Sequence, residues 1–86
     1  MKKYIIDSKK FISKEKSYSY LNEIFKFDYY VKNLDALFDQ LSSKRDIIIE
    51  IKNSDLIEKN LGEYGKKIIE TFSSLNSNDV IVSFLF

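Results

Sequence analysis

The stretch that decides the fold is "DIIIEI", residues 46–51. Its β-branched residues are nearly continuous, which is typical of a strand that is covered on both faces or nearly so. Two further stretches of this kind are "KYII" at 3–6 and "VIVSFLF" at 80–86. Long helical segments separate the three, and such connections join parallel strands through right-handed crossovers. We therefore expect a parallel sheet in which residues 46–51 are central or well covered. An apolar strand at an open edge invites aggregation, so the last strand should be covered too.

Serine, asparagine and glycine mark the ends of four helices between these strands. The expected helices run from Ser13 or Ser17 to about Phe25, from Asn33 to about Ser42, from Asn53 or Ser54 to Gly62, and through Ile68, Ile69, Phe72 and Leu75. An aromatic-rich loop at 26–32 separates the first two. The element order is βααβααβ. The sequence thus predicts a single small two-layer α/β domain over residues 1–86, with a three-stranded parallel sheet and four helices.

Composition narrows the range of functions. The 86 residues include no cysteine and no histidine, so disulfides, thiolate catalysis and zinc ribbons are excluded, and the commonest general base is missing. No apolar run approaches the roughly 20 residues of a membrane span. The apolar stretch in the start "MKKYIIDSKK" is too short for an export signal. We expect a cytoplasmic protein.

The basic residues gather at the start of the chain. Residues 1–16 hold six lysines against two carboxylates, whereas residues 17–86 carry eight basic and eleven acidic side chains. This asymmetry leaves one alternative function open, a small nucleic-acid-binding module that uses the lysine-rich start. The plainer interpretation is a solvated rim around the first strand, since no Gly-rich loop, arginine cluster or base-stacking motif accompanies the lysines.

A pair of aspartates stands out in "YYVKNLDALFDQL", residues 29–41. Apolar residues at 34, 37, 38 and 41 form a helical stripe, and Asp35 and Asp39 lie one turn apart beside it. Like charges at this spacing cost an isolated helix roughly 0.2–0.5 kcal/mol. The helix dipole favours Asp35 in the first turn but does not help Asp39. No basic residue occurs between Lys32 and Lys44 to relieve the repulsion. An external cationic partner would explain the arrangement.

Catalysis and metal binding explain these residues less well. Two carboxylates serve acid–base chemistry when their environments differ, but both of these are expected on an exposed helix face. Asp28 together with Asp35 and Asp39 lacks the spacing of a calcium loop. We expect no enzyme activity, no cofactor and no metal. Ordinary core packing is expected for at least one of Tyr29 and Tyr30.

The same stretch resembles the signature of the barstar-type ribonuclease inhibitors, which reads roughly YYGxNLDALWDxL, over 13 contiguous positions. The resemblance implies a bacterial immunity protein that plugs the basic active-site cleft of a secreted ribonuclease toxin. The second helix and the loop before it would bind, with Asp39 in a phosphate pocket and Asp35 as a second anionic contact. The partner-binding residues that the resemblance implies are Tyr29, Tyr30, Asn33, Leu34, Asp35, Phe38 and Asp39.

Four departures from that family pattern stand out. Val31 replaces a common glycine, so the loop path is expected to differ, and Phe38 replaces a tryptophan. The loop "SSKRD" at 42–46 is short and basic, where relatives have a longer aromatic segment. Ser73 and Ser74 occupy the stretch in which a further acidic contact is expected. These differences bear more on which ribonuclease is recognised than on how it is bound.

Overall fold

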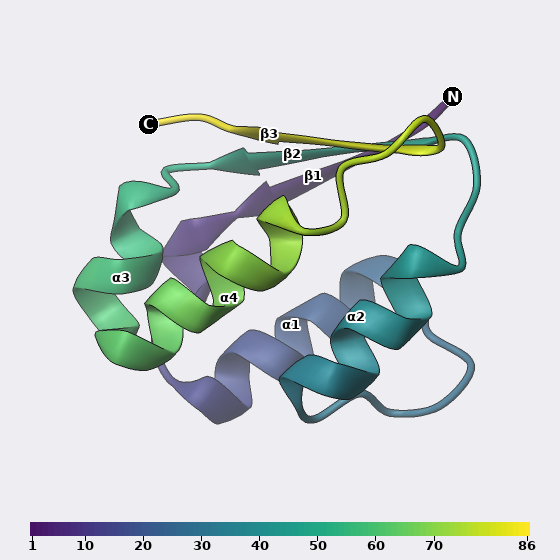
Figure 1. Cartoon of the computed structure of the whole chain (residues 1–86). Helices are drawn as coiled ribbons and strands as arrows, with labels where there is room; N and C mark the ends of the chain where they lie inside the picture. Colours follow the sequence, from purple (N-terminus) through teal and green to yellow (C-terminus); the bar gives the residue numbers. More distant parts are fainter.

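Three strands and four helices follow one another in the predicted βααβααβ order, in a computed structural model that describes residues 1–86 (Figure 1). The elements are β1 Lys2–Asp7, the short 3₁₀ turn η1 Ser8–Lys10, α1 Lys14–Phe25, α2 Leu34–Ser42, β2 Ile47–Lys52, α3 Asp55–Leu61, α4 Glu63–Ser73 and β3 Val80–Phe84. The sheet has the order β1-β2-β3, and both pairings are parallel. The predicted α/β architecture with β2 in the centre is confirmed.

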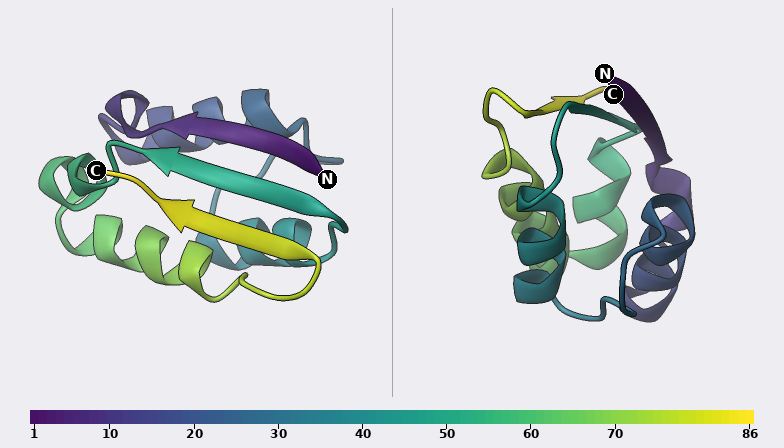
Figure 2. Two further views of the ribbon diagram at one scale, coloured as in Figure 1. Left: turned by 90° about the horizontal axis from the view of Figure 1, so that it is seen from above. Right: turned by 90° about the vertical axis from the view of Figure 1, so that its right-hand side faces the viewer.

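β2 is central, as expected, but helices cover only one of its two faces. All four helices lie on one face of the sheet, because two right-handed crossovers that advance in the same direction place their helices on the same side (Figure 2). Ile47, Ile49 and Ile51 point into the core beneath the helices and are buried. Ile48 and Glu50 alternate with them and are only half-buried. Their face is open, and there Glu50 pairs with the Lys3 ammonium at 3.0 Å.

The last strand is an edge strand, and only its first half is covered. The Val82 N–H donates to Asn76 Oδ1 at 2.8 Å, and the Ser77 N–H donates to the Val80 carbonyl at 2.9 Å. The loop that precedes β3 therefore occupies the beginning of its outer edge. The expected cover of the last strand is thus partial, and this loop restrains edge pairing where the strand is most apolar.

The helix boundaries follow the predicted caps. Ser13 Oγ accepts from the Lys16 N–H at 3.1 Å at the start of α1, and Gly62 ends α3 with a positive φ of 60°. Leu75, expected in the fourth helix, lies just past its end and is buried there. One core of 17 buried hydrophobic side chains joins the helices to the sheet. No helix has both the length and the apolar character that crossing a membrane requires.

A close approach between α3 and α4 depends on one glycine. A Cβ placed on Gly65 would lie 2.3 Å from the Ile57 carbonyl oxygen and 2.8 Å from the Glu58 Cα. Both neighbours are backbone atoms of α3, so they cannot turn aside as a side chain would. The two helices consequently pack at a distance that only glycine permits at this position.

Candidate functional site

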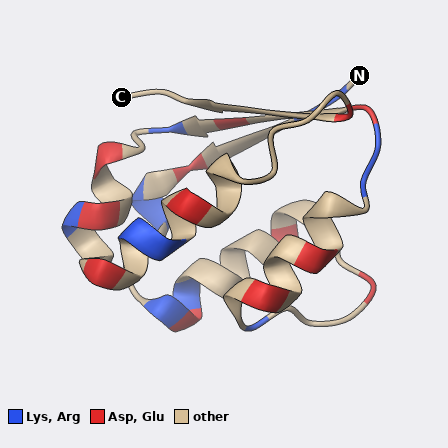
Figure 3. Ribbon diagram, in the orientation of Figure 1, with Lys and Arg blue, Asp and Glu red and all other residues tan.

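Helix α2 presents one side to the core and the other to solvent. Asn33 begins it, with Oδ1 accepting from the Ala36 N–H at 2.7 Å, as the sequence predicts. Leu37 and Leu41 are fully buried on the inner side. Helical geometry then directs Asp35 and Asp39 outward, and both are exposed. Figure 3 shows the two acidic bands on the outer side of α2.

A shallow groove of about 680 Å³ runs between α2 and α4. Its lining residues are Leu34, Asp35, Phe38, Asp39 and Ser42 from α2, and Lys67, Glu70, Thr71 and Ser74 from α4 and its end. The chain's ion pairs are Lys3–Glu50, Arg45–Asp79 and Lys66–Glu63, so none of the carboxylates in this groove is paired. The groove holds three carboxylates against one ammonium, and its charge is available to a partner.

The contribution of α4 was missed in the sequence. Lys67, Glu70, Thr71 and Ser74 recur at helical spacing, so they form one polar stripe opposite the buried Ile68 and Phe72 side. That periodicity was the signal that could have revealed the stripe. Ser74 lies in the groove together with Glu70, an acidic residue one turn earlier.

The tyrosine loop is held in place by a residue that sequence reasoning also missed. Asn22 of α1 donates from Nδ2 to the Val31 carbonyl at 2.7 Å and accepts the Val31 N–H on Oδ1 at 2.8 Å. It also donates to the Tyr18 carbonyl at 2.7 Å. We call this set of contacts the Asn22 clamp. The only signal in the sequence is an asparagine inside a helix, where that residue is disfavoured unless its side chain is used.

The clamp determines which loop side chains reach solvent. Val31 is fully buried with 0% exposure, whereas Tyr29 and Tyr30 are 50% and 59% exposed. The expectation that at least one tyrosine packs in the core is therefore wrong, because Val31 fills that place. The valine at the usual glycine position anchors the loop from the inside.

The seven predicted partner-binding residues do not all gather in one place. Leu34, Asp35, Phe38 and Asp39 share the α2–α4 groove. Leu34 is half-buried, and Phe38 is 40% exposed at the groove. Of the remaining three, Tyr30 lines a separate hollow, and the Asn33 side chain caps α2 just before Leu34. Tyr29 is exposed but lines neither cavity.

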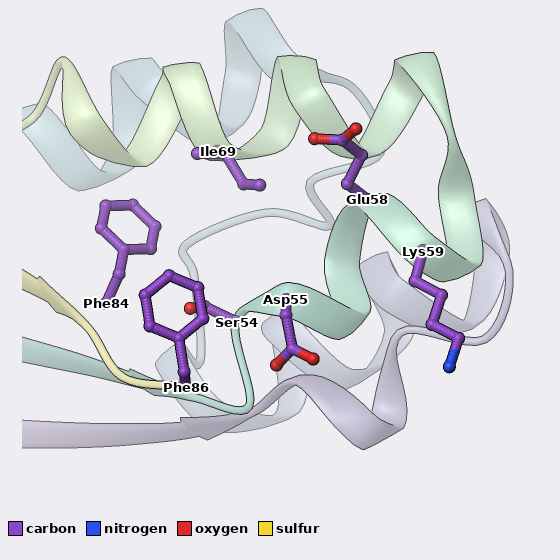
Figure 4. A pocket seen from close by; sticks show the side chains of 7 residues that line it. All are labelled: Ser54, Asp55, Glu58, Lys59, Ile69, Phe84 and Phe86. Carbon is purple, nitrogen blue, oxygen red and sulfur yellow. The ribbon is translucent and has the colours of Figure 1, made fainter.

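A separate pocket of about 540 Å³ lies where β2 and β3 end beside α3 (Figure 4). The rings of Phe84 and Phe86 face it, with Asp55 and Glu58 near its rim. The Ser54 Oγ behind them is buried and has no hydrogen-bond partner. Ligands of α/β proteins often bind at the carboxyl ends of parallel strands. None of the predicted site residues lies here, however, so this pocket is distinct from the α2 surface.

No group of three or more histidine, cysteine, aspartate or glutamate side chains is placed to hold a metal ion. Asp28, Asp35 and Asp39 consequently do not form a site of that kind. Exposed carboxylates with no partner inside the chain are suited to contact a cationic surface instead.

Comparison with known proteins identifies the family. The family model described as Barstar (barnase inhibitor) matches residues 1–84. A search of curated protein sequences gives no match. The family match covers β1 through the end of β3, so it includes the whole sheet, the Asn22 clamp and the α2–α4 groove. The chain belongs to the barstar family of barnase inhibitors.

Proposed function

We propose that this protein is a cytoplasmic immunity protein that inhibits a basic ribonuclease by filling its active-site cleft with α2 and the tyrosine loop. The observation that carries the proposal is the unpaired, exposed carboxylate pair Asp35 and Asp39 on the α2–α4 groove. Membership of an inhibitor family supports the same role.

The physical basis is substitution for phosphate. A ribonuclease binds the RNA backbone with cationic side chains, and the α2 carboxylates offer these cations negative charge at a fixed spacing. The two aspartates repel each other in the free protein, and the cations of the cleft relieve that repulsion in the complex. RNA is then excluded by occupancy and by charge neutralisation. No bond is made or broken in either partner.

The tyrosine loop supplies the apolar part of the contact. Tyr29 and Tyr30 are held outward by the Asn22 clamp, so the loop loses little freedom on binding. Large aromatic rings beside a central charged group are the usual composition of an energetic hot spot. We expect Asp39 to contribute most, because the resemblance to the inhibitor family implies that it enters a phosphate pocket of the ribonuclease, while Asp35 makes a second anionic contact.

The test is inhibition of RNA cleavage by two ribonucleases: barnase, and the product of the reading frame adjacent to that of this chain. Nanomolar inhibition of at least one is expected. Asp39→Ala should weaken binding at least about 30-fold, which corresponds to roughly 2 kcal/mol, and Asp35→Ala should weaken it less. Tyr29→Ala should lose affinity with little change in salt dependence. Added salt should slow association with the parent protein.

The control variant is Lys9→Ala/Lys10→Ala in the lysine-rich start. These lysines border another hollow with Lys16 and Tyr20. Tyr20 is poorly suited to stack on a base, since its hydroxyl accepts the Asp7 N–H at 2.9 Å and its ring packs edge-on against a core phenylalanine. The proposal fails if neither ribonuclease is inhibited. It also fails if the lysine control loses inhibition while Asp39→Ala keeps it. Salt-sensitive binding of single-stranded RNA would favour the nucleic-acid-binding alternative.

A further inference from the structure

The hollow that Tyr30 lines has a volume of about 460 Å³ and lies between the tyrosine loop and the start of α1. We call it the lysine hollow; its lining residues are Ser13, Lys14, Glu15, Tyr18, Tyr30 and Lys32. Lys32 is only two residues before Leu34, which lines the acidic groove. The two cavities are therefore close along the chain, although they share no lining residue. Figure 3 shows basic segments at the start of α1 and just before α2, and the acidic bands of α2 follow the second of these segments along the chain.

The charge of this hollow is not compensated within the protein. Neither Lys14 nor Lys32 forms an ion pair, although Glu15 lines the same hollow. The Lys14 ammonium lies over the Tyr64 ring, 4.7 Å from its centroid. An aromatic face attracts a cation but carries no formal negative charge, so unlike a carboxylate it does not cancel the net charge of the site. Two ammonium groups against one carboxylate leave a net positive site.

The Lys14 side chain rests on an aromatic pair, in which Tyr18 is buried and Tyr64 is half-buried. The hydroxyl groups of Tyr18 and Tyr64 share a hydrogen bond, and their rings meet edge to face at 6.4 Å. Tyr18 is almost fully buried, so it fixes the Tyr64 ring on which the ammonium rests. A long, flexible side chain thereby loses freedom before any partner arrives, which reduces the entropic cost of a later contact.

We propose that the lysine hollow receives an acidic side chain of the same ribonuclease, at the margin of the cleft that α2 enters. This inference rests on the proposed function. The inhibitor would then present negative charge to the catalytic cleft and positive charge to a carboxylate beside it. A ribonuclease with a basic residue at that place would be repelled, so the lysine hollow would select among ribonucleases whose clefts are alike.

Charge-reversal variants distinguish a local contact at the lysine hollow from the long-range electrostatic effect of the protein's net charge. Replacing lysine by glutamate makes the inhibitor more acidic, which should speed its association with a basic ribonuclease if only the overall field mattered. The variants are Lys32→Glu and Lys14→Glu/Lys32→Glu. The matched control is Lys9→Glu/Lys10→Glu, which changes the net charge by the same amount as the double variant and lies in a different hollow.

The measurement is the Kd for the ribonuclease that the parent protein inhibits. We expect at least a tenfold rise for the double variant and no weakening beyond threefold for the control. Alanine substitution of each Asp and Glu around the ribonuclease cleft, one at a time, should reveal one residue whose loss removes most of the effect. If the Lys14 change lowers stability, Lys32→Glu alone tests the role of the lysine hollow, because the exposed Lys32 side chain makes no hydrogen bond or ion pair.

Three outcomes would overturn the inference. If the double variant binds as well as the control while Asp39→Ala loses inhibition, the lysine hollow has no part in recognition and the proposed function stands. If no acidic residue of the ribonuclease couples to the lysines, the hollow does not bind a carboxylate. If the parent protein inhibits neither ribonuclease, the proposed function fails and this inference fails with it.

Discussion

Replacing Asn22 by alanine tests the Asn22 clamp. The change leaves the N–H and C=O of the buried Val31 without their partners at 2.8 and 2.7 Å. A buried backbone group without a partner costs about 1–3 kcal/mol. Two such groups cost about 2–6 kcal/mol together. The higher helix propensity of alanine offsets roughly 0.6 kcal/mol of this loss in stability. We therefore expect the free energy of unfolding to fall by about 1–5 kcal/mol, large for a single side chain in an 86-residue protein.

Urea denaturation and amide hydrogen exchange measure the two consequences. The Val31 amide should lose its protection in Asn22→Ala, and the ribonuclease should bind more weakly because Tyr29 and Tyr30 are no longer held outward. Ser19→Ala is the matched control, an exposed change on the same helix that should stay within about 0.5 kcal/mol of the parent. A loss below 0.5 kcal/mol for Asn22→Ala, with unchanged Val31 exchange, would refute the reasoning.

Three further predictions concern stability. Gly65→Ala should lower the free energy of unfolding by at least about 2 kcal/mol in urea denaturation, since its Cβ would meet the α3 backbone; parent-like stability would contradict the close approach. Burial and the hydrogen bond to Tyr64 raise the pKa of the Tyr18 hydroxyl above its ordinary 10.0. The protonated Tyr18 hydroxyl therefore contributes fully to folding stability below pH 10, and this contribution is lost as the pH rises above 10. Tyr18→Phe should reduce the loss of thermal stability at alkaline pH, measured by thermal melts. Leu37→Ala should cost about 2–5 kcal/mol by chemical denaturation, while Asp39→Ala should leave stability unchanged or slightly higher; unfolding by Asp39→Ala would make that carboxylate structural.

Local signals were enough to predict most of the fold. Ser13, Asn33 and Gly62 mark helix ends through short-range hydrogen bonds and backbone freedom, so they can be read from a few neighbouring residues. The isoleucine run of β2 correctly indicated a central strand. It misled about the second face, because Ile48 has the same side chain whether or not a helix lies over it.

The orientation of the tyrosine loop could not be read from the sequence. It depends on a contact between Asn22 and Val31, nine positions apart, that exists only once α1 and the loop have packed. The composition of the α2–α4 groove could not be fully predicted for the same reason. Asp35 and Asp39 belong to one short motif, whereas Glu70 reaches the groove only because α4 lies beside α2. Short motifs therefore identified half of the groove, and tertiary packing supplied the other half.

The division of α2 into two sides has a practical consequence. Leu37 and Leu41 are fully buried, while the side chains of Asp35 and Asp39 make no hydrogen bond or ion pair within the protein. These two outward positions can be varied without disturbing the packing that holds the helix in place. A library randomised there would yield variants of nearly constant stability that differ mainly in what they bind. The protein is thus a small, cysteine-free scaffold for redirecting inhibition to clefts of other shapes and charges.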